Sequence, residues 1–431
     1  MENTEKLLAY FKRISDNSYY KKMIDFDSIN LMNVWDYYYN LPVMDKNRVF
    51  DNIDSYFSRD FYEDCKEVDL KSVFFDMESL SKNHDKMISG NKNKWRVEFT
   101  TGTTGKPFPV VKASSTRMIE SAYLLKQRRR RDSSVNLENG FKFLHSWQPE
   151  LNGIDVWKFN EEDIKCITDV WLKDKPKWML ATPLIYSKYA EYILNNGINV
   201  FEENDLSFLE YTSQYMHQEE KEKIKRVFHC PLVSSFGSRE CWNMAYECSE
   251  GNLHVNNEYL LVDIVDENGK VIIDSEIEGN VIITHLANIH MPLIKYIFDD
   301  RAKKKRVKCK CGNESEIICF CQGRESSKLV NTPYYGTNIF RRVMRGIYFH
   351  DNISDIKNIC IIQDEDYHIS VFVEKRKLND SFFEKRFVER TKSVVPEIDN
   401  FKISFIYGSY VSNEVKNCKS EIFKNILKDK R

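Results

Sequence analysis

The stretch Glu98-Phe-Thr-Thr-Gly-Thr-Thr-Gly-Lys-Pro107 combines glycines with hydroxyl side chains behind a short apolar run. Its two glycines can adopt positive φ, which lets backbone N–H groups converge on an anion. It is not a Walker A loop, because the glycines are too close together and Pro107 stands where that motif needs its serine or threonine. The stretch therefore predicts a different phosphate cradle, formed by Thr100, Thr101, Gly102, Thr103, Thr104, Gly105 and Lys106. Taken alone, it is also compatible with a threonine-rich surface turn.

Length and composition exclude several classes of function. The chain has 431 residues, of which 42% are hydrophobic, so it can build substantial cores. A formal net charge of −1 provides no field that would attract nucleic acid or an acidic membrane surface. Its first residues lack the basic flank and apolar run of a signal peptide, and no apolar run is long enough to span a bilayer. We therefore expect a cytoplasmic protein without a nucleic-acid partner and without membrane insertion.

Hydrophobic periodicity predicts an α/β fold. Residues 1–90 have apolar side chains at helical spacing, and strand-like runs then alternate with helical patterns. Hairpins follow in a β-rich part over residues 255–323, with one strand expected at 271–273. We expect a large N-terminal domain over residues 1–323 and a small α+β domain over residues 324–431. The predicted elements of the small domain are strands at 359–363, 368–373 and 401–407 and a helix at 382–395.

Two runs of basic residues could indicate binding of an anion or a nucleic acid. Arg128–Arg131 ends a helix that Ser114 or Ser115 can cap, and we expect a solvated last turn there, which suits the helix dipole. Lys303–Arg306 has no interleaved aromatic residues, so we expect a solvated loop rather than a nucleic-acid contact.

Three further motifs follow the threonine-rich turn in a fixed order. They are Phe236-Gly-Ser-Arg-Glu240, Met291-Pro-Leu-Ile-Lys-Tyr296 continuing to Asp300, and Gly323-Arg324. From about Trp95 to the C-terminus, this series resembles the adenylate-forming superfamily of acyl-CoA synthetases, luciferases and adenylation domains. The residues of these motifs are most similar to those of the phenylacetate–CoA ligase-like branch, whose relatives include capsule-biosynthesis adenylating proteins.

The resemblance implies an ATP-dependent ligase that converts a small carboxylic acid into an acyl-adenylate and releases pyrophosphate. The C-terminal domain would be a mobile lid, and the acyl group would then pass to CoA. An alternative acceptor is an amine in surface-glycan or natural-product assembly, and a carrier protein also stays open. An alternative of another class is a catalytically impaired nucleotide-binding scaffold. Relatives of this branch are often dimeric, which makes a homodimer compatible with the resemblance.

The resemblance also assigns roles residue by residue. Glu240 is the expected Mg²⁺ ligand, and one carboxylate suffices because Mg²⁺ takes its other oxygens from water and phosphates. Asp300 is expected to hold the ribose hydroxyls, and Arg324 to contact the same ribose and mark the hinge. Thr104 and Lys419 complete the expected catalytic set, with Lys416 as the alternative lid lysine. The remaining nucleotide contacts would come from Ser235, Phe236, Gly237, Ser238 and Arg239.

Asp299 replaces a glycine that is usual in the family, so an assignment of the ribose contact shifted by one residue from Asp300 stays open. Three further positions depart from the family pattern. Arg239 stands in place of the usual threonine, Cys418 in place of the glycine before the lid lysine, and no aspartate follows Arg324. These departures motivate the scaffold alternative.

The cysteines contain one cluster with metal-ligand spacing. Cys309-Lys-Cys311 is a short thiolate turn, and Cys248 and His254 lie upstream. Cys₃His is an ordinary tetrahedral zinc set in a reducing compartment. Members of the phenylacetate–CoA ligase-like branch have a similar pattern, so the resemblance implies a structural Zn²⁺. The alternatives are free cysteines or a Cys₄ set in which Cys319 and Cys321 join Cys309 and Cys311.

Overall fold

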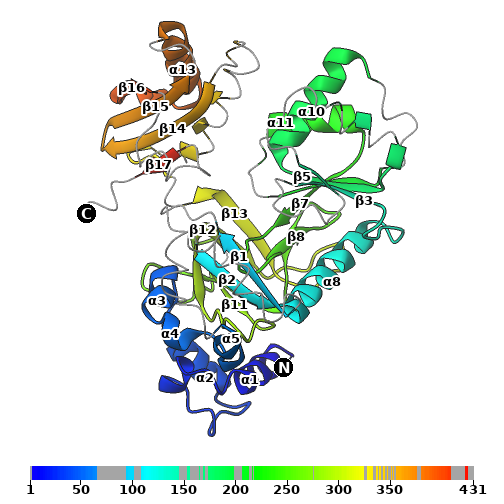
Figure 1. Ribbon diagram of the computed structural model, residues 1–431, viewed down its shortest axis with the longest axis vertical. Helices are drawn as coiled ribbons and strands as arrows, with labels where there is room; N and C mark the ends of the chain where they lie inside the picture. Colours follow the sequence, from blue (N-terminus) through cyan, green and yellow to red (C-terminus); the bar gives the residue numbers. More distant parts are fainter. Residues whose placement is uncertain are drawn as a thin grey trace.

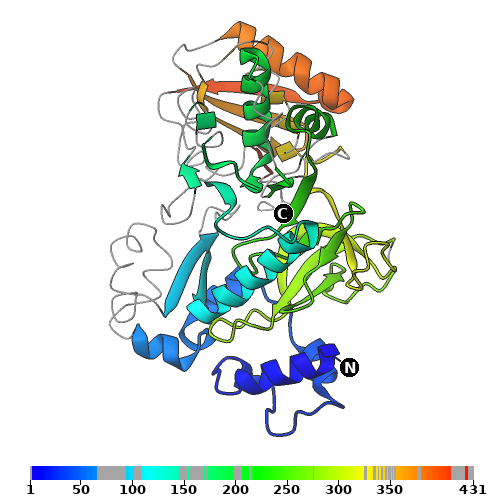
Figure 2. The same ribbon diagram turned by 90° about the vertical axis from the view of Figure 1, so that its right-hand side faces the viewer.

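The computed structural model describes most of the chain. The described residues are 2–65, 94–100, 108–144, 153–155, 165, 168–169, 173–198, 206–212, 216, 218–274, 276–324, 328–332, 336–337, 339–340, 343–344, 347, 351, 353, 356–375, 380–408 and 423–425. Figures 1 and 2 show that helix α1 and helix α13 lie at opposite ends of the molecule. No described helix is both long and apolar enough to cross a bilayer.

Short helices form the start of the chain over the described residues 2–65, whereas residues 66–90 of the predicted helical start lie outside the described residues. They are α1 (Glu2–Arg13), η1 (Tyr20–Lys22), α2 (Val34–Asn40), α3 (Lys46–Asp51), α4 (Ile53–Tyr56) and α5 (Arg59–Asp64). Leu7, Tyr10 and Phe11 recur at helical spacing and bury one face of α1. These helices share one hydrophobic core with the β-rich part of the chain. The Tyr56 hydroxyl, for example, donates to the Pro292 carbonyl at 2.6 Å.

One large mixed sheet organises the N-terminal domain. Its strands are β3 (Gly140–Leu144), β4 (Gly153–Asp155), β5 (Trp178–Ala181), β6 (Phe208–Tyr211), β7 (Leu232–Phe236), β8 (Ala245–Glu247), β9 (Leu253–Val255), β10 (Leu260–Val265), β11 (Gly279–His285), β12 (Tyr296–Lys305) and β13 (Ile317–Arg324). Their order is β10-β11-β12-β13-β9-β8-β7-β6-β5-β3-β4. β7 pairs in parallel with β6 through its first residues and antiparallel with β8 through Ser235 and Phe236. The sheet therefore changes from parallel to antiparallel at the end of β7.

Helices cover both faces of the parallel half, because its strands are apolar on both sides. Met179 and Leu209 face α10 (Pro183–Asn196) and α11 (Gln218–Phe228), whereas their neighbours Trp178 and Phe208 pack with Leu124 of α8. Helix α8 spans Ser114–Arg131 and directly follows the hairpin of β1 (Trp95–Thr100) and β2 (Phe108–Ala113). Figure 2 shows α8 lying beside that hairpin. The α/β architecture predicted from the sequence is confirmed.

The C-terminal part forms a separate α+β unit, also as predicted. Its sheet has the order β16-β15-β14-β17, and α13 crosses between the parallel strands β15 and β16. The bounds are β14 (Ile356–Glu365), β15 (His368–Lys375), α13 (Ser381–Val394), η3 (Pro396–Asn400), β16 (Lys402–Tyr407) and β17 (Phe423–Asn425). Phe383 and Phe387 of α13 pack with Ile361 and Val371 in a core of their own.

Several local expectations were wrong. Ser114 begins α8 as a helical residue, Ala113 holds the N-cap position, and no side chain caps that end. The expected strand at 271–273 is reduced to a single bridge between Val271 and Val265. Both errors come from patterns that are too short to outweigh tertiary packing.

The two basic runs also differ from the expectation. Arg128 is buried, at 3% exposure, and forms a bidentate pair with Glu210 at 2.7 and 2.9 Å. Lys303–Lys305 belong to β12, and the side chain of Lys304, which is 8% exposed, pairs with Asp263 at 2.6 Å. In both places a carboxylate from a distant strand neutralises a cation that the sequence alone suggests is solvated.

Candidate functional site

The predicted phosphate cradle connects the two strands of the β1–β2 hairpin. Strand pairing runs from Trp95 and Ala113 to Thr100 and Phe108, which fixes both ends of the turn. Residues 101–107 lie outside the described residues, so Thr101, Gly102, Thr103, Thr104, Gly105 and Lys106 stay predictions. Of Thr100, the backbone is described as the last residue of β1.

The predicted metal ligand Glu240 lies in a tight turn directly after β7. Its residue exposure is 7%, and the Tyr296 hydroxyl donates a hydrogen bond to its carboxylate. Burial, together with the negative charge of Glu240, raises the pKa of Tyr296 well above its ordinary value. Tyr296 closes the Met291–Tyr296 motif, so this hydrogen bond joins two of the motifs quoted from the sequence.

The other residues of the Phe236–Glu240 motif shape that turn. A Cβ on Gly237 would lie 1.8 Å from the Trp242 carbonyl oxygen, so only glycine fits there. The Ser238 carbonyl accepts the Trp242 N–H at 2.7 Å, and the Ser235 hydroxyl accepts from Asn243 at 3.0 Å. Arg239 is exposed.

Phe236, the residue expected to pack against a nucleobase, already has an aromatic neighbour. The Phe320 ring of β13 stacks on it with 3.5 Å between ring centroids and an interplanar angle of 21°. Phe320 was not predicted, and no sequence signal marks it. One face of the Phe236 ring is thus covered, and a planar ligand would need the other face.

The two residues expected at the ribose lie opposite each other. Asp300 of β12 and Arg324 of β13 are cross-strand partners in the register of the antiparallel pair. Cross-strand partners project toward the same face of a sheet, so the pairing suits two residues that act on one ligand. Of Arg324, only the backbone is described. The expected lid lysine Lys419, its alternative Lys416, and Cys418 lie outside the described residues.

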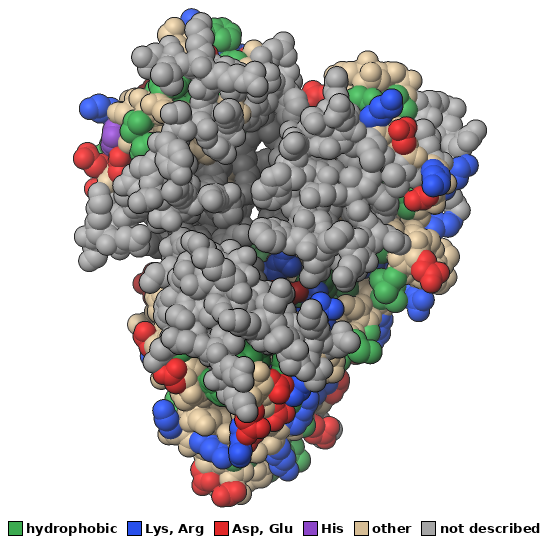
Figure 3. Space-filling model, viewed as in Figure 1, with side chains coloured by type: hydrophobic (Ala, Val, Ile, Leu, Met, Phe, Trp, Pro, Cys, Tyr) green, Lys and Arg blue, Asp and Glu red, His purple; other side chains and the backbone are tan. Residues whose placement is uncertain are grey.

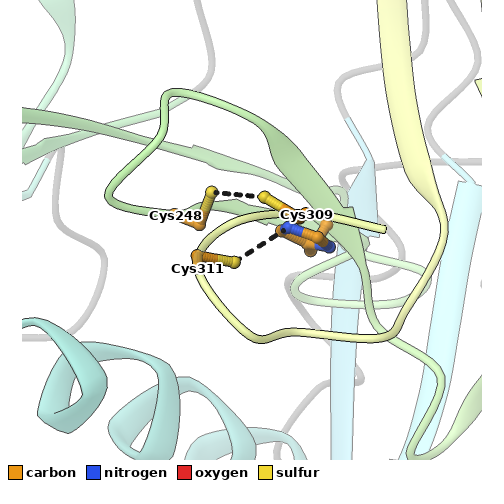
Figure 4. A group of neighbouring side chains, drawn as sticks. Cys248, Cys309 and Cys311 are labelled. Atoms are coloured by element: carbon orange, nitrogen blue, oxygen red, sulfur yellow. Dashed lines mark hydrogen bonds between the residues drawn. The ribbon is translucent and has the colours of Figure 1, made fainter. Parts of the chain in front are cut away.

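Cys248, His254, Cys309 and Cys311 come together, as predicted for a metal site. Their ligand atoms all lie within 4.8 Å of one another. Figure 4 shows the loop with Cys309 and Cys311 crossing the hairpin that carries Cys248. The Cys248 and Cys309 sulfurs are 3.8 Å apart, and about 3.8 Å is the separation that a tetrahedral ion with metal–sulfur bonds of about 2.3 Å requires. Cys319, the alternative partner, is exposed and lies outside this group.

The surroundings prepare this cluster for a cation. The Ser315 carbonyl can only accept a hydrogen bond, so His254 donates from Nδ1 over 2.9 Å and keeps Nε2 as a free lone pair. That Nε2 atom lies 3.3 Å from the Cys311 sulfur. A hydrogen bond from the Cys311 backbone N–H lowers the pKa of Cys309 to about 6, which favours the thiolate that a metal needs. The four residues fit a closed tetrahedral site.

The sequence matches no protein-family model, and a search of curated proteins found no match. Among solved structures, the chain is similar to 2-hydroxyisobutyryl-CoA ligase at 12% sequence identity. The TM-score is 0.59 for its postadenylation state in complex with 2-HIB-AMP, which covers 95% of this chain and 86% of the ligase. For its thioesterification state in complex with 2-HIB-AMP and CoA, the TM-score is 0.56 at 12% identity, with 98% and 89% covered. For an open conformation in complex with the same two molecules, it is 0.53 at 12% identity, with 94% and 88% covered. The chain therefore has the fold of this ligase, as its motifs predict.

Proposed function

We propose that this protein activates a small carboxylic acid with ATP, forming an acyl-adenylate and releasing pyrophosphate. The observation that carries the proposal is the junction at the end of β7. There Glu240 is buried in a constrained turn and accepts a hydrogen bond from Tyr296, so two of the sequence motifs meet at one carboxylate. The fold is that of a ligase whose crystal structures contain an acyl-AMP.

The reaction needs two anions to be brought together, so positioning and charge neutralisation do most of the work. A carboxylate oxygen of the acid attacks the α-phosphorus of ATP, a new C–O–P linkage forms, and the bond to pyrophosphate breaks. Glu240 would hold Mg²⁺, which neutralises charge on the phosphates. The cradle at residues 100–106 would bind the phosphates, and Lys419 of the lid would approach the α-phosphate.

The adenosine part would lie along β7, β12 and β13. Phe236 would pack against adenine with the ring face that Phe320 leaves open, and Asp300 would accept hydrogen bonds from the ribose hydroxyls. Arg324, its cross-strand partner, would contact the same ribose. The register of β12 and β13 supports a shared role for these two residues.

For the second step we propose transfer of the acyl group to CoA. The similar ligase, whose structures contain CoA, supports this acceptor. The alternative acceptors are a carrier protein and the amine that the capsule-biosynthesis relatives suggest. They stay open because the branch of the superfamily is assigned from the motif residues alone. The interspersed charges of the described side chains in Figure 3 suit a small-molecule substrate better than a polyanion.

We further propose that Cys248, His254, Cys309 and Cys311 hold a structural Zn²⁺. The protein would fill all four ligand positions of a tetrahedral ion, so no position stays open for catalysis. The ion would hold the hairpins of the β-rich part together. Elemental analysis of the purified protein tests this. About one zinc per chain is expected, and protein that carries no metal contradicts the proposal.

Pyrophosphate exchange into ATP across a panel of aryl, fatty, amino and hydroxy acids tests the adenylation step. We expect exchange with at least one class of acid, and a loss of roughly a hundredfold in Glu240→Gln. Glu267→Gln, at an exposed turn, is the matched control. Wild-type protein that binds ATP but exchanges with no acid would favour the scaffold alternative.

A further inference from the structure

The guanidinium of Arg117, at the start of α8, contacts two segments that carry motifs of the proposed site. Its Nη1 donates to Glu120 Oε2 at 2.7 Å, and its Nη2 lies 3.4 Å from Glu98 Oε1. Its Cζ lies 3.6 Å from the centroid of the Trp242 ring. The side chain is only 18% exposed, so these contacts are shielded from solvent. Sequence reasoning gave Arg117 no role.

Trp242, which Arg117 contacts, belongs to the turn that contains Glu240. Trp242 has a φ of 59°, in the left-handed region that a bulky residue rarely adopts. Its N–H closes the turn on the Ser238 carbonyl, and its own carbonyl blocks any side chain at position 237. A residue in a strained conformation persists only where its surroundings hold it. The planar Arg117 side chain stacked on the indole is one such support.

The contact with Glu98 reaches the base of the predicted phosphate cradle. Glu98 lies in β1 opposite Val110 of β2, so it sits in the ordered part of the hairpin, two residues before Thr100. Its side chain is 11% exposed, and its second oxygen, Oε2, is buried without a hydrogen-bond partner in the described part of the chain. The ion pair with Arg117 is therefore the polar contact that anchors this carboxylate among the described residues.

Glu120 fixes Arg117 in place. Its other oxygen accepts from Lys112 Nζ at 2.6 Å and lies 3.0 Å from His285 Nε2, and all three of these side chains are fully buried. Burial lowers the pKa of His285, which favours the neutral ring. Two cations thus face the carboxylates of Glu98 and Glu120, and the cluster balances its own charge. This balance of charge indicates a structural cluster that holds the segments together (a brace) rather than a ligand site.

We propose that Arg117 is a positioning residue that couples the Glu240 turn to the described base of the β1–β2 hairpin. It holds the Glu240 turn at a fixed distance from Glu98, so that one Mg–ATP can engage the motifs that both segments carry. The inference rests on the proposed function, because it assigns Arg117 to the Mg–ATP side of that site.

Calorimetric ATP binding with Mg²⁺ and with EDTA tests this proposal in the full-length protein. Arg117→Met and Arg117→Lys should both weaken Mg–ATP binding about tenfold, since a lysine lacks the planar face and the paired donors. The gain in affinity that Mg²⁺ provides should shrink, while the KM for the acid in pyrophosphate exchange stays unchanged. Trp242→Leu should likewise weaken Mg–ATP binding without changing the KM for the acid, and Trp242→Phe should keep a Mg–ATP affinity near that of the wild type. Arg130→Met, an exposed arginine on the same helix, is the matched control.

A purely structural role would lower the melting temperature and leave Mg–ATP affinity per folded molecule unchanged, and that result would overturn the proposal. Should Arg117→Met not fold, Arg117→Lys and the two Trp242 variants carry the same test. Wild-type protein that binds Mg–ATP without exchanging pyrophosphate would refute the adenylation proposal, and the binding data would still decide the role of Arg117. Wild-type protein that binds no Mg–ATP would overturn both.

Discussion

Two buried polar clusters in the N-terminal domain are assembled in the same way and differ in one respect. The charge cluster of Glu98, Lys112, Arg117, Glu120 and His285 joins α8 to β1, β2 and β11 and completes its own ionic pairs. The thiol cluster of Cys248, His254, Cys309 and Cys311 joins two loops of the β-rich part and presents only electron-pair donors. The first balances its own charge, whereas the second would be completed by the Zn²⁺ that we propose. Buried polar groups from distant segments can therefore signal either a brace or a ligand site, and the balance of charge within the cluster tells them apart.

The largest expected effect comes from breaking the thiol cluster. Cys309→Ser should abolish zinc retention and lower the melting temperature by roughly 10 °C or more, because a structural zinc site contributes its binding free energy to folding. Elemental analysis and thermal unfolding measure this. Cys319→Ser, which changes an exposed cysteine outside the cluster, should behave as wild type. Equal stability of the two variants would contradict a structural metal.

Breaking the charge cluster should have the next largest effect. Glu120→Gln leaves the fully buried Lys112 without a counter-charge, and we expect the free energy of unfolding to fall by about 3–5 kcal/mol. Urea unfolding measures this loss. Glu63→Gln removes a carboxylate of similar chemistry from the exposed pair with Arg59 and should change stability by about 0.5 kcal/mol or less. A loss below about 1 kcal/mol in Glu120→Gln would show that the cluster does not act as a brace.

Acid should weaken the charge cluster within a defined window. Burial alone would raise the pKa of Glu120, but Lys112, His285 and Arg117 outweigh it and lower the pKa from 4.5 to about 2. A carboxyl group with a depressed pKa stabilises the fold above its unfolded value and loses that contribution as the pH falls toward its folded value. The stability gap between wild type and Glu120→Gln, worth about 3 kcal/mol by this shift, should stay constant from pH 7 to about 4.5 and narrow below. Urea titrations at a series of pH values check this, and a gap that closes already between pH 7 and 5 would contradict it.

The smallest expected effect lies in the support of the thiol cluster. Asn252 donates from Nδ2 to the Cys309 sulfur over 3.4 Å. Asn252→Ala should weaken zinc affinity roughly tenfold and leave the fold and the charge cluster intact, as expected for a group that orients a metal ligand. Competition with a zinc chelator measures the affinity, and Asn257→Ala, an exposed neighbour, is the control. An unchanged affinity would show that the Asn252 contact is incidental.

Much of the fold was predictable because its signals are local. The strands at 359–363, 368–373 and 401–407 and the helix at 382–395 carry regular apolar spacing, and the structure contains all four. The predicted β-rich part likewise carries the antiparallel strands β10 to β13. The strand wrongly predicted at 271–273 is too short for its periodicity to be decisive.

The partners of buried charges were not predictable from the sequence. Arg128 and Glu210 are 82 positions apart, and Lys304 and Asp263 are 41 apart. A run of arginines or lysines looks the same in sequence whether it is solvated or neutralised by a distant carboxylate. Only the packing of α8 on β6, and the position of β12 two strands from β10 in the large sheet, settles which of the two occurs.

By itself, the sequence determined the α/β class, the small C-terminal unit and the order of motifs that resembles the adenylate-forming superfamily, because periodicity and turn chemistry act over a few residues. The tertiary structure decided which cysteines cluster with His254, how Tyr296 meets Glu240, and that Arg117 stands between the Glu240 turn and the base of the phosphate cradle. Those outcomes depend on side chains that approach from segments far apart in the chain. Their energies exist only once the core has packed and water has been excluded from around them.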